Sequence, residues 1–109
     1  MPGRAAGPRK RAAGGADPLV ESFLGALAAE RGASPHTVAA YRGDLGHFGS
    51  WLARSGSPGR AGGADTAMVR AYAASLVDSG LSARSVSRRL SALRSFYMHG
   101  CRRGWFKSN

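Results

Sequence analysis

The chain has 109 residues, a length that suits one small domain and is too short for two ordinary hydrophobic cores. Its 16 Lys and Arg residues against 6 Asp and Glu residues give a net charge of +10, which attracts polyanions, nucleic acid first and an anionic membrane surface second. Cys101 is the only cysteine, which excludes an intramolecular disulfide and a zinc site built on cysteines. The sequence shows no secretion signal and no apolar run of about 18–20 residues, so we expect a cytoplasmic protein.

Residues 1–16 are mostly Gly, Ala, Pro and Arg, with no apolar periodicity. Such a segment buries too little surface to offset its chain entropy, so we expect a disordered basic tail. Its cluster Arg9-Lys10-Arg11 either adds sequence-independent phosphate contacts or is a solvated tail without a role.

Two helices are expected next, each beginning at a capping residue followed by proline. The first begins at Asp17-Pro18 and ends at Gly32. The second begins at Ser34-Pro35, ends at Gly56 and is followed by a flexible connection over residues 57–63. The predicted apolar positions are Leu19, Phe23, Leu27 and Ala28 in the first helix, and Val38, Tyr41, Leu45, Phe48 and Leu52 in the second.

Two further helices complete an all-α fold, a compact four-helix bundle. The third begins at Asp65 or Thr66 and ends at Ser79-Gly80, and the fourth runs from a cap at Ser82 to about Arg103. The third helix should bury Met68, Val69, Tyr72, Ala73 and Leu76. The fourth helix should bury Val86, Leu90, Leu93, Tyr97 and Cys101, and Phe96 should lie at the margin of this apolar face.

The fourth helix has an unusual charge pattern, since it contains six arginines and no acid: Arg84, Arg88, Arg89, Arg94, Arg102 and Arg103. Like charges four residues apart destabilise a helix, so the pattern favours an external anionic partner. Arginine bridges phosphate oxygens or binds guanine edges, and serine allows close approach, so the alternation of Arg and Ser suits DNA. The alternative is a solvated basic face in an arginine-rich protein.

Catalytic motifs are absent from the sequence. The three histidines are too scattered for a metal site, and all three tyrosines occupy apolar helical positions. Asp44 is interpreted as a structural acid that pairs with an arginine or with a helix end. Thr37 lies in the first turn of the second helix, where its hydroxyl and the free backbone N–H groups could hold a phosphate. We therefore expect no active site, no metal and no cofactor.

Two strings resemble the N-terminal core-binding domain of Xer-type tyrosine recombinases, within the phage-integrase family. The first is Ser34-x-x-Thr37-x-x-x-Tyr41-x-x-Asp44-Leu45-x-x-Phe48, and the second is Leu90-Ser91-Ala92-Leu93-Arg94-x-Phe96-Tyr97. The resemblance covers residues 17–109 and implies a SAM-like four-helix unit that forms half of a clamp around duplex DNA and touches neighbouring protomers in a synaptic tetramer. The glycine-rich connection and the basic tail are not part of the family pattern.

The resemblance implies that the second and fourth helices face the major groove of a recombination half-site. It carries DNA contact onto Thr37, Arg42, Arg84, Ser87, Arg88, Ser91 and Arg94. By the resemblance, residues 17–104 would form the DNA-binding domain, and residues 105–109 would begin a linker to an absent catalytic domain. The chain itself would then not cleave DNA. The whole recombinase would act in DNA integration or in chromosome or plasmid dimer resolution. Two alternatives stay open, namely a free-standing helix-turn-helix regulator and a membrane-surface or protein-interaction module.

Overall fold

The computed structural model describes residues 17–55 and 66–106. All regular structure in these two ranges is helical, which confirms the expected all-α class. The helices are α2 (Pro18–Arg31), α3 (Pro35–Arg54), α4 (Thr66–Asp78) and α5 (Ala83–Arg102). The predicted basic tail, the glycine-rich connection and residues 107–109 lie outside the described residues.

Side-chain caps determine where three of the helices begin, as predicted. The Asp17 carboxylate accepts a hydrogen bond from the backbone N–H of Leu19 at 3.0 Å. The Ser34 and Ser82 hydroxyl oxygens accept from the N–H groups three residues later, at 3.1 Å each. Each cap satisfies a backbone donor that the first helical turn leaves without a partner.

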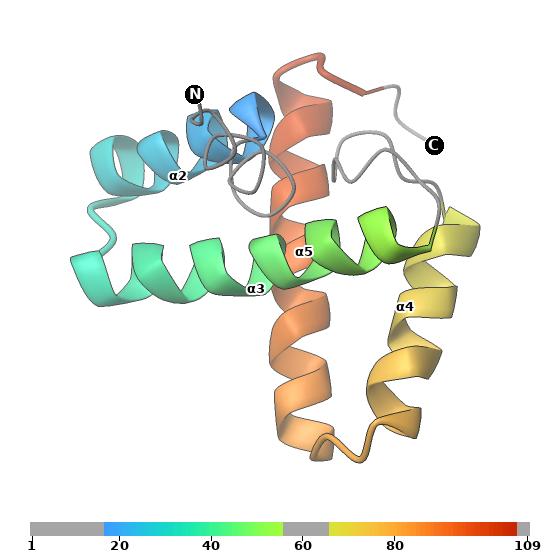
Figure 1. Cartoon of the computed structure of the whole chain (residues 1–109). Helices are drawn as coiled ribbons and strands as arrows, with labels where there is room; N and C mark the ends of the chain where they lie inside the picture. The colour runs from blue at the N-terminus through green and yellow to red at the C-terminus, as the bar shows by residue number, and fades with distance from the viewer. Residues whose placement is uncertain (1–16, 56–65, 107–109) are drawn as a thin grey trace, which may run out of the picture.

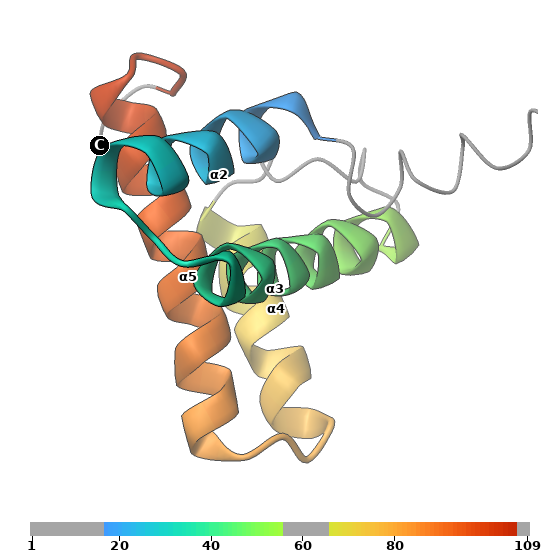
Figure 2. The ribbon, with the colours of Figure 1, turned by 90° about the vertical axis from the view of Figure 1, so that its left-hand side faces the viewer.

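The helices form two antiparallel pairs that cross each other (Figure 1). α2 runs beside α3, and α4 runs beside α5, while α3 passes across the middle of α5. The side view in Figure 2 shows the same crossing. Among the described helices, α5 contacts α2, α3 and α4, so it is the central element of this part of the fold.

Aromatic rings fill the core at this crossing. Phe23, Phe48, Tyr72 and Phe96 are fully or almost fully buried, and the rings of Phe23 and Phe96 meet edge to face with centroids 5.7 Å apart. The prediction that Phe96 lies at the margin of its apolar arc is wrong: because α5 is covered on several sides, its buried face extends to Phe96, which is 0% exposed.

The buried face of α2 also differs from the prediction. Val20 and Leu24 are buried with Phe23 and Leu27, whereas Ala28 is exposed. Because α2 packs against both α3 and α5, its buried face follows the i, i+3, i+4, i+7 positions that begin at Val20. Valine and leucine also bury more apolar surface than alanine.

The chain continues to pack after α5 ends. Gly104, at φ 78°, reverses the chain, and the backbone N–H of Trp105 donates to the Gly100 carbonyl at 2.8 Å. Trp105 and Phe106 then pack against the hydrophobic core, although both were expected at the beginning of a linker. These two residues therefore add aromatic surface to the packed unit.

Candidate nucleic-acid interface

One side of α5 faces solvent and has no carboxylate of its own. We call it the α5 outer face and define it by five exposed residues: Arg84, Ser87, Arg88, Ser91 and Arg94. At 1.5 Å per residue, its ends lie about 15 Å apart along the helix. Five of the seven residues predicted to contact DNA therefore share one continuous surface.

Arg88, in the middle of this face, has a partner within the protein. Its Nη2 and Nε atoms donate to the two carboxylate oxygens of Asp44 on α3, at 2.9 and 3.2 Å. The Asp44 side chain is 8% exposed and that of Arg88 59% exposed. The prediction of Asp44 as a structural acid is confirmed, and the expectation that Arg88 has no balancing acid is wrong, because the acid comes from another helix.

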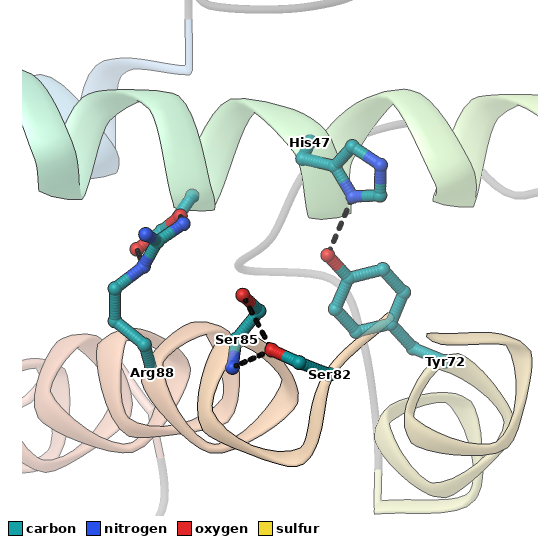
Figure 3. Close-up of polar contacts among 6 residues, drawn as sticks. His47, Tyr72, Ser82, Ser85 and Arg88 are labelled. Carbon is teal, nitrogen blue, oxygen red and sulfur yellow. Dashed lines mark hydrogen bonds and ion pairs between the residues drawn. The ribbon is translucent and has the colours of Figure 1, made fainter. Parts of the chain in front are cut away.

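The Arg88–Asp44 pair still leaves donors for an outside partner. Figure 3 shows the Arg88 side chain rising from α5 toward α3. A guanidinium has more N–H groups than the two that Asp44 accepts, and the side chain remains mostly exposed. The pair thus joins α5 to α3 while the unused edge of the guanidinium stays accessible.

The two ends of the α5 outer face differ from its centre. Within the described ranges, neither Arg84 nor Arg94 takes part in an ion pair. Arg84 also lies in the first turn of α5, where the free backbone N–H groups and the helix dipole favour anions. These two guanidinium groups carry the uncompensated positive charge of the face.

Arg42 lies apart from the α5 outer face. Positions two apart on a helix differ by about 200°, so Arg42 and Asp44 point to nearly opposite sides of α3. The Arg42 guanidinium instead binds Glu21 of α2 through two hydrogen bonds, at 2.7 and 3.3 Å. The hydrogen bond and the charge of Glu21 raise the pKa of Arg42. The structure thus does not bring Arg42 together with the other predicted DNA contacts on α5.

Thr37 occupies an exposed position in the first turn of α3. Its backbone N–H already donates to the Ser34 hydroxyl oxygen at 3.1 Å, so this N–H is not one of the free backbone groups of the turn that a phosphate could use. The Ser34 hydroxyl also donates to Thr37 Oγ1 at 3.1 Å. The Thr37 hydroxyl can still donate its own proton outward.

A second basic cluster, which the sequence reasoning did not identify, lies where α3, α4 and α5 meet. His47, Arg54 and Arg89 line the same pocket there. The residues come from two helices, and only the crossing of α3 over α5 brings them together. Among the described residues, no group of His, Cys, Asp and Glu is arranged to hold a metal ion, and none of the four helices is long and apolar enough to cross a bilayer.

Comparison with known proteins identifies a family and several relatives. The sequence profile of the phage integrase N-terminal SAM-like domain matches residues 20–104. The tyrosine recombinase XerC of Xylella fastidiosa (strain M23) is 41% identical over 91 residues, which cover 84% of this chain and 31% of the relative.

Other relatives give the same picture. The tyrosine recombinase XerD of Bradyrhizobium diazoefficiens is 46% identical over 79 residues, which cover 72% of this chain and 24% of the relative. XerC of Oceanobacillus iheyensis is 40% identical over 90 residues, 83% of this chain and 29% of the relative. The chain thus spans less than a third of each of these proteins, and no solved structure matches it.

Proposed function

Because the chain belongs to the phage integrase N-terminal SAM-like domain family, we propose that it binds duplex DNA at a recombination half-site as the N-terminal part of a site-specific tyrosine recombinase. In this proposal, strand cleavage belongs to a separate catalytic domain and the present unit has no active site. Its partners are double-stranded DNA and, in the whole recombinase, neighbouring protomers. The names of the relatives, XerC and XerD, support the assignment to site-specific recombination.

The observation that carries the proposal is the α5 outer face. Arg84 and Arg94, which have no carboxylate partner among residues 17–55 and 66–106, lie at its ends, and small serine hydroxyls lie between them. A net charge of +10 draws the domain toward DNA from a distance. The serines let the helix approach the groove closely, so the arginines reach phosphates or base edges.

The rigidity of the crossing supports the same proposal. Arg88 and Asp44 join α5 to α3 near the centre of the α5 outer face, and α5 packs on α2, α3 and α4. A helix held in this way presents its side chains to DNA with little loss of conformational freedom on binding. In the proposal Arg88 therefore orients the face and also offers its free N–H edge to a phosphate.

The test measures affinity for a duplex that contains one half-site, as a function of salt. With six to ten phosphate contacts, we expect affinity to fall on the order of 10³–10⁵-fold between 50 and 200 mM salt. Arg84→Ala and Arg94→Ala should each weaken binding more than Arg70→Ala, which removes the same charge from an exposed position on α4. A flat salt response, or equal effects of all three variants, contradicts the proposal.

The same material distinguishes a recombinase module from a free-standing regulator. A recombinase module should bind one half-site of about ten base pairs as a monomer, whereas a helix-turn-helix regulator binds two half-sites about one helical turn apart as a dimer. Sedimentation of the protein with one half-site and with a palindrome measures this stoichiometry. A stable dimer without DNA favours the regulator.

A further inference from the structure

The basic pocket formed by α3, α4 and α5 is separate from the α5 outer face. It has a volume of about 280 Å³. Among the described residues, three basic ones line it, His47 and Arg54 from α3 and Arg89 from α5, together with the apolar side chains of Trp51, Leu76 and Leu81. Ser75 and Ser79 also line it, and no carboxylate of the described part of the chain does.

A hydrogen bond orients one of the basic groups, His47. The Nδ1 atom of His47 lies 2.6 Å from the Tyr72 hydroxyl, as Figure 3 shows. Burial raises the pKa of the Tyr72 hydroxyl, and the nearby charge of Arg89 opposes this rise. Which partner of the His47–Tyr72 hydrogen bond donates depends on the tautomer of the imidazole. In the imidazolium form both ring nitrogens carry a proton, so Nε2 can then donate to an anion in the pocket.

Within the part of the chain that the structure describes, no acid forms an ion pair with a basic group of this pocket. Burial, together with the charges of Arg89 and Arg54, lowers the pKa of His47, and Asp44 opposes this effect. The Nε atom of Arg89 is buried and has no hydrogen-bond partner among the described residues. The hydroxyl groups of Ser75 and Ser79 donate to carbonyl groups of α4 at 2.8 Å, so the donors left for a ligand come from α3 and α5.

We propose that the pocket between α3, α4 and α5 is a phosphate site, with Arg54, Arg89 and His47 as ligands and Trp51 as its apolar wall. A phosphate group presents several oxygens and up to two negative charges, which match two guanidinium groups and one imidazole. The group is either a backbone phosphate of duplex DNA or a free phosphate. The inference of a DNA phosphate rests on the proposed function, whereas the inference of a free phosphate does not.

The test follows the imidazole resonances of His47 by NMR while pH is varied, with and without inorganic phosphate at constant ionic strength. A bound anion favours the imidazolium form, so phosphate should raise the proton affinity of His47 about tenfold, in a saturable way. Arg54→Ala should abolish this rise, whereas Arg84→Ala, which removes the same charge from the α5 outer face, should leave it unchanged. Chloride at equal ionic strength should have no such effect.

A second arm of the experiment uses the half-site duplex in place of inorganic phosphate. If a DNA phosphate occupies the pocket, the duplex raises the proton affinity of His47 and inorganic phosphate adds nothing further. If the ligand is a free phosphate, inorganic phosphate raises the proton affinity of His47 even when the duplex is already bound. The inference is overturned if neither probe changes His47, or if chloride does so equally. DNA binding that depends on Arg84 and Arg94 would then still stand.

Discussion

Arg88 on α5 binds Asp44 on α3 in the one ion pair, among those of the described residues, that has a buried member. The carboxylate is 8% exposed and the guanidinium side chain 59% exposed. The two partners therefore differ in what their loss costs. Removing the guanidinium leaves a buried charge without a partner, whereas removing the carboxylate leaves a cation that water can solvate.

We therefore expect Arg88→Met to lower the free energy of unfolding by about 2 kcal/mol, a value reduced from that of a fully buried pair because Arg88 is mostly exposed. Asp44→Asn should cost about 1 kcal/mol, since the amide oxygen still accepts a hydrogen bond. Urea denaturation monitored by circular dichroism measures both changes. If Asp44→Asn lowers the free energy of unfolding more than Arg88→Met does, the main role of Arg88 is not to stabilise the buried charge of Asp44.

DNA binding should depend unequally on the arginines that were predicted to contact it. Arg84→Ala should weaken half-site binding by about 1–3 kcal/mol if Arg84 reads a base, and by less if it meets only phosphate. Arg42→Ala should cost less than Arg84→Ala, because Glu21 already neutralises Arg42 and the side chain points away from α5. Titration of a labelled duplex at several salt concentrations gives both the affinity and the number of phosphate contacts.

A matched variant tests the Arg42 argument further. Glu21→Gln removes the partner of Arg42 and leaves the α5 outer face unchanged. If Arg42 lies outside the DNA interface, this variant should alter affinity only by the small general effect of one lost negative charge. A large gain in affinity that disappears in the double variant with Arg42→Ala would place Arg42 in the interface.

The packing of the C-terminal residues predicts a contrast between two helical glycines. A Cβ atom at Gly100 would overlap the ring of Phe106, whereas a Cβ at Gly43 meets nothing within 4 Å. We expect Gly100→Ala to destabilise the fold by about 1–3 kcal/mol through overpacking. Gly43→Ala should stabilise it by roughly 0.5–1 kcal/mol, because alanine has the higher helix propensity.

Thermal or urea unfolding measures these two changes, and Phe106→Ala supplies the control. In the Phe106→Ala background the overlap is gone, so Gly100→Ala should become neutral or stabilising. A double-mutant cycle without coupling between the two positions would mean that Phe106 does not pack on α5 in solution.

Local signals predicted the fold well because each of them acts within a few residues. The caps at Asp17, Ser34 and Ser82 satisfy backbone donors in their own helix, so the sequence alone locates these helix starts. Phe96 was misplaced because its burial depends on how many helices surround α5, which a single helical wheel does not contain.

The candidate site was predictable only in part for the same reason. The acid-free arginine and serine pattern of α5 is local, and the structure shows it as one exposed face. The partners of Arg88 and Arg42 lie 44 and 21 residues away in the sequence. Charge compensation over such separations depends on how the helices cross, so counting charges along one helix overestimated its free charge.

Acid should destabilise the protein through His99. Burial, followed by the charges of Arg103 and Arg102, lowers the pKa of this imidazole, which lies between the rings of Phe23 and Trp105. A lowered pKa in the folded state means that the unfolded chain binds more protons, so stability is complete above about pH 6.5 and falls as the pH drops through the folded-state pKa. Urea denaturation between pH 7.5 and 5 measures this slope.

His99→Leu should reduce the acid sensitivity and raise stability at neutral pH. The Nε2 atom of His99 is buried and has no hydrogen-bond partner among the described residues, whereas leucine has no polar atom that needs one. Part of the slope should remain, since the pKa of His47 is also lowered by burial. His36→Asn, at an exposed position in the first turn of α3, is the matched control and should leave the slope unchanged. An unaltered slope in His99→Leu would show that His99 is accessible to protons without loss of packing.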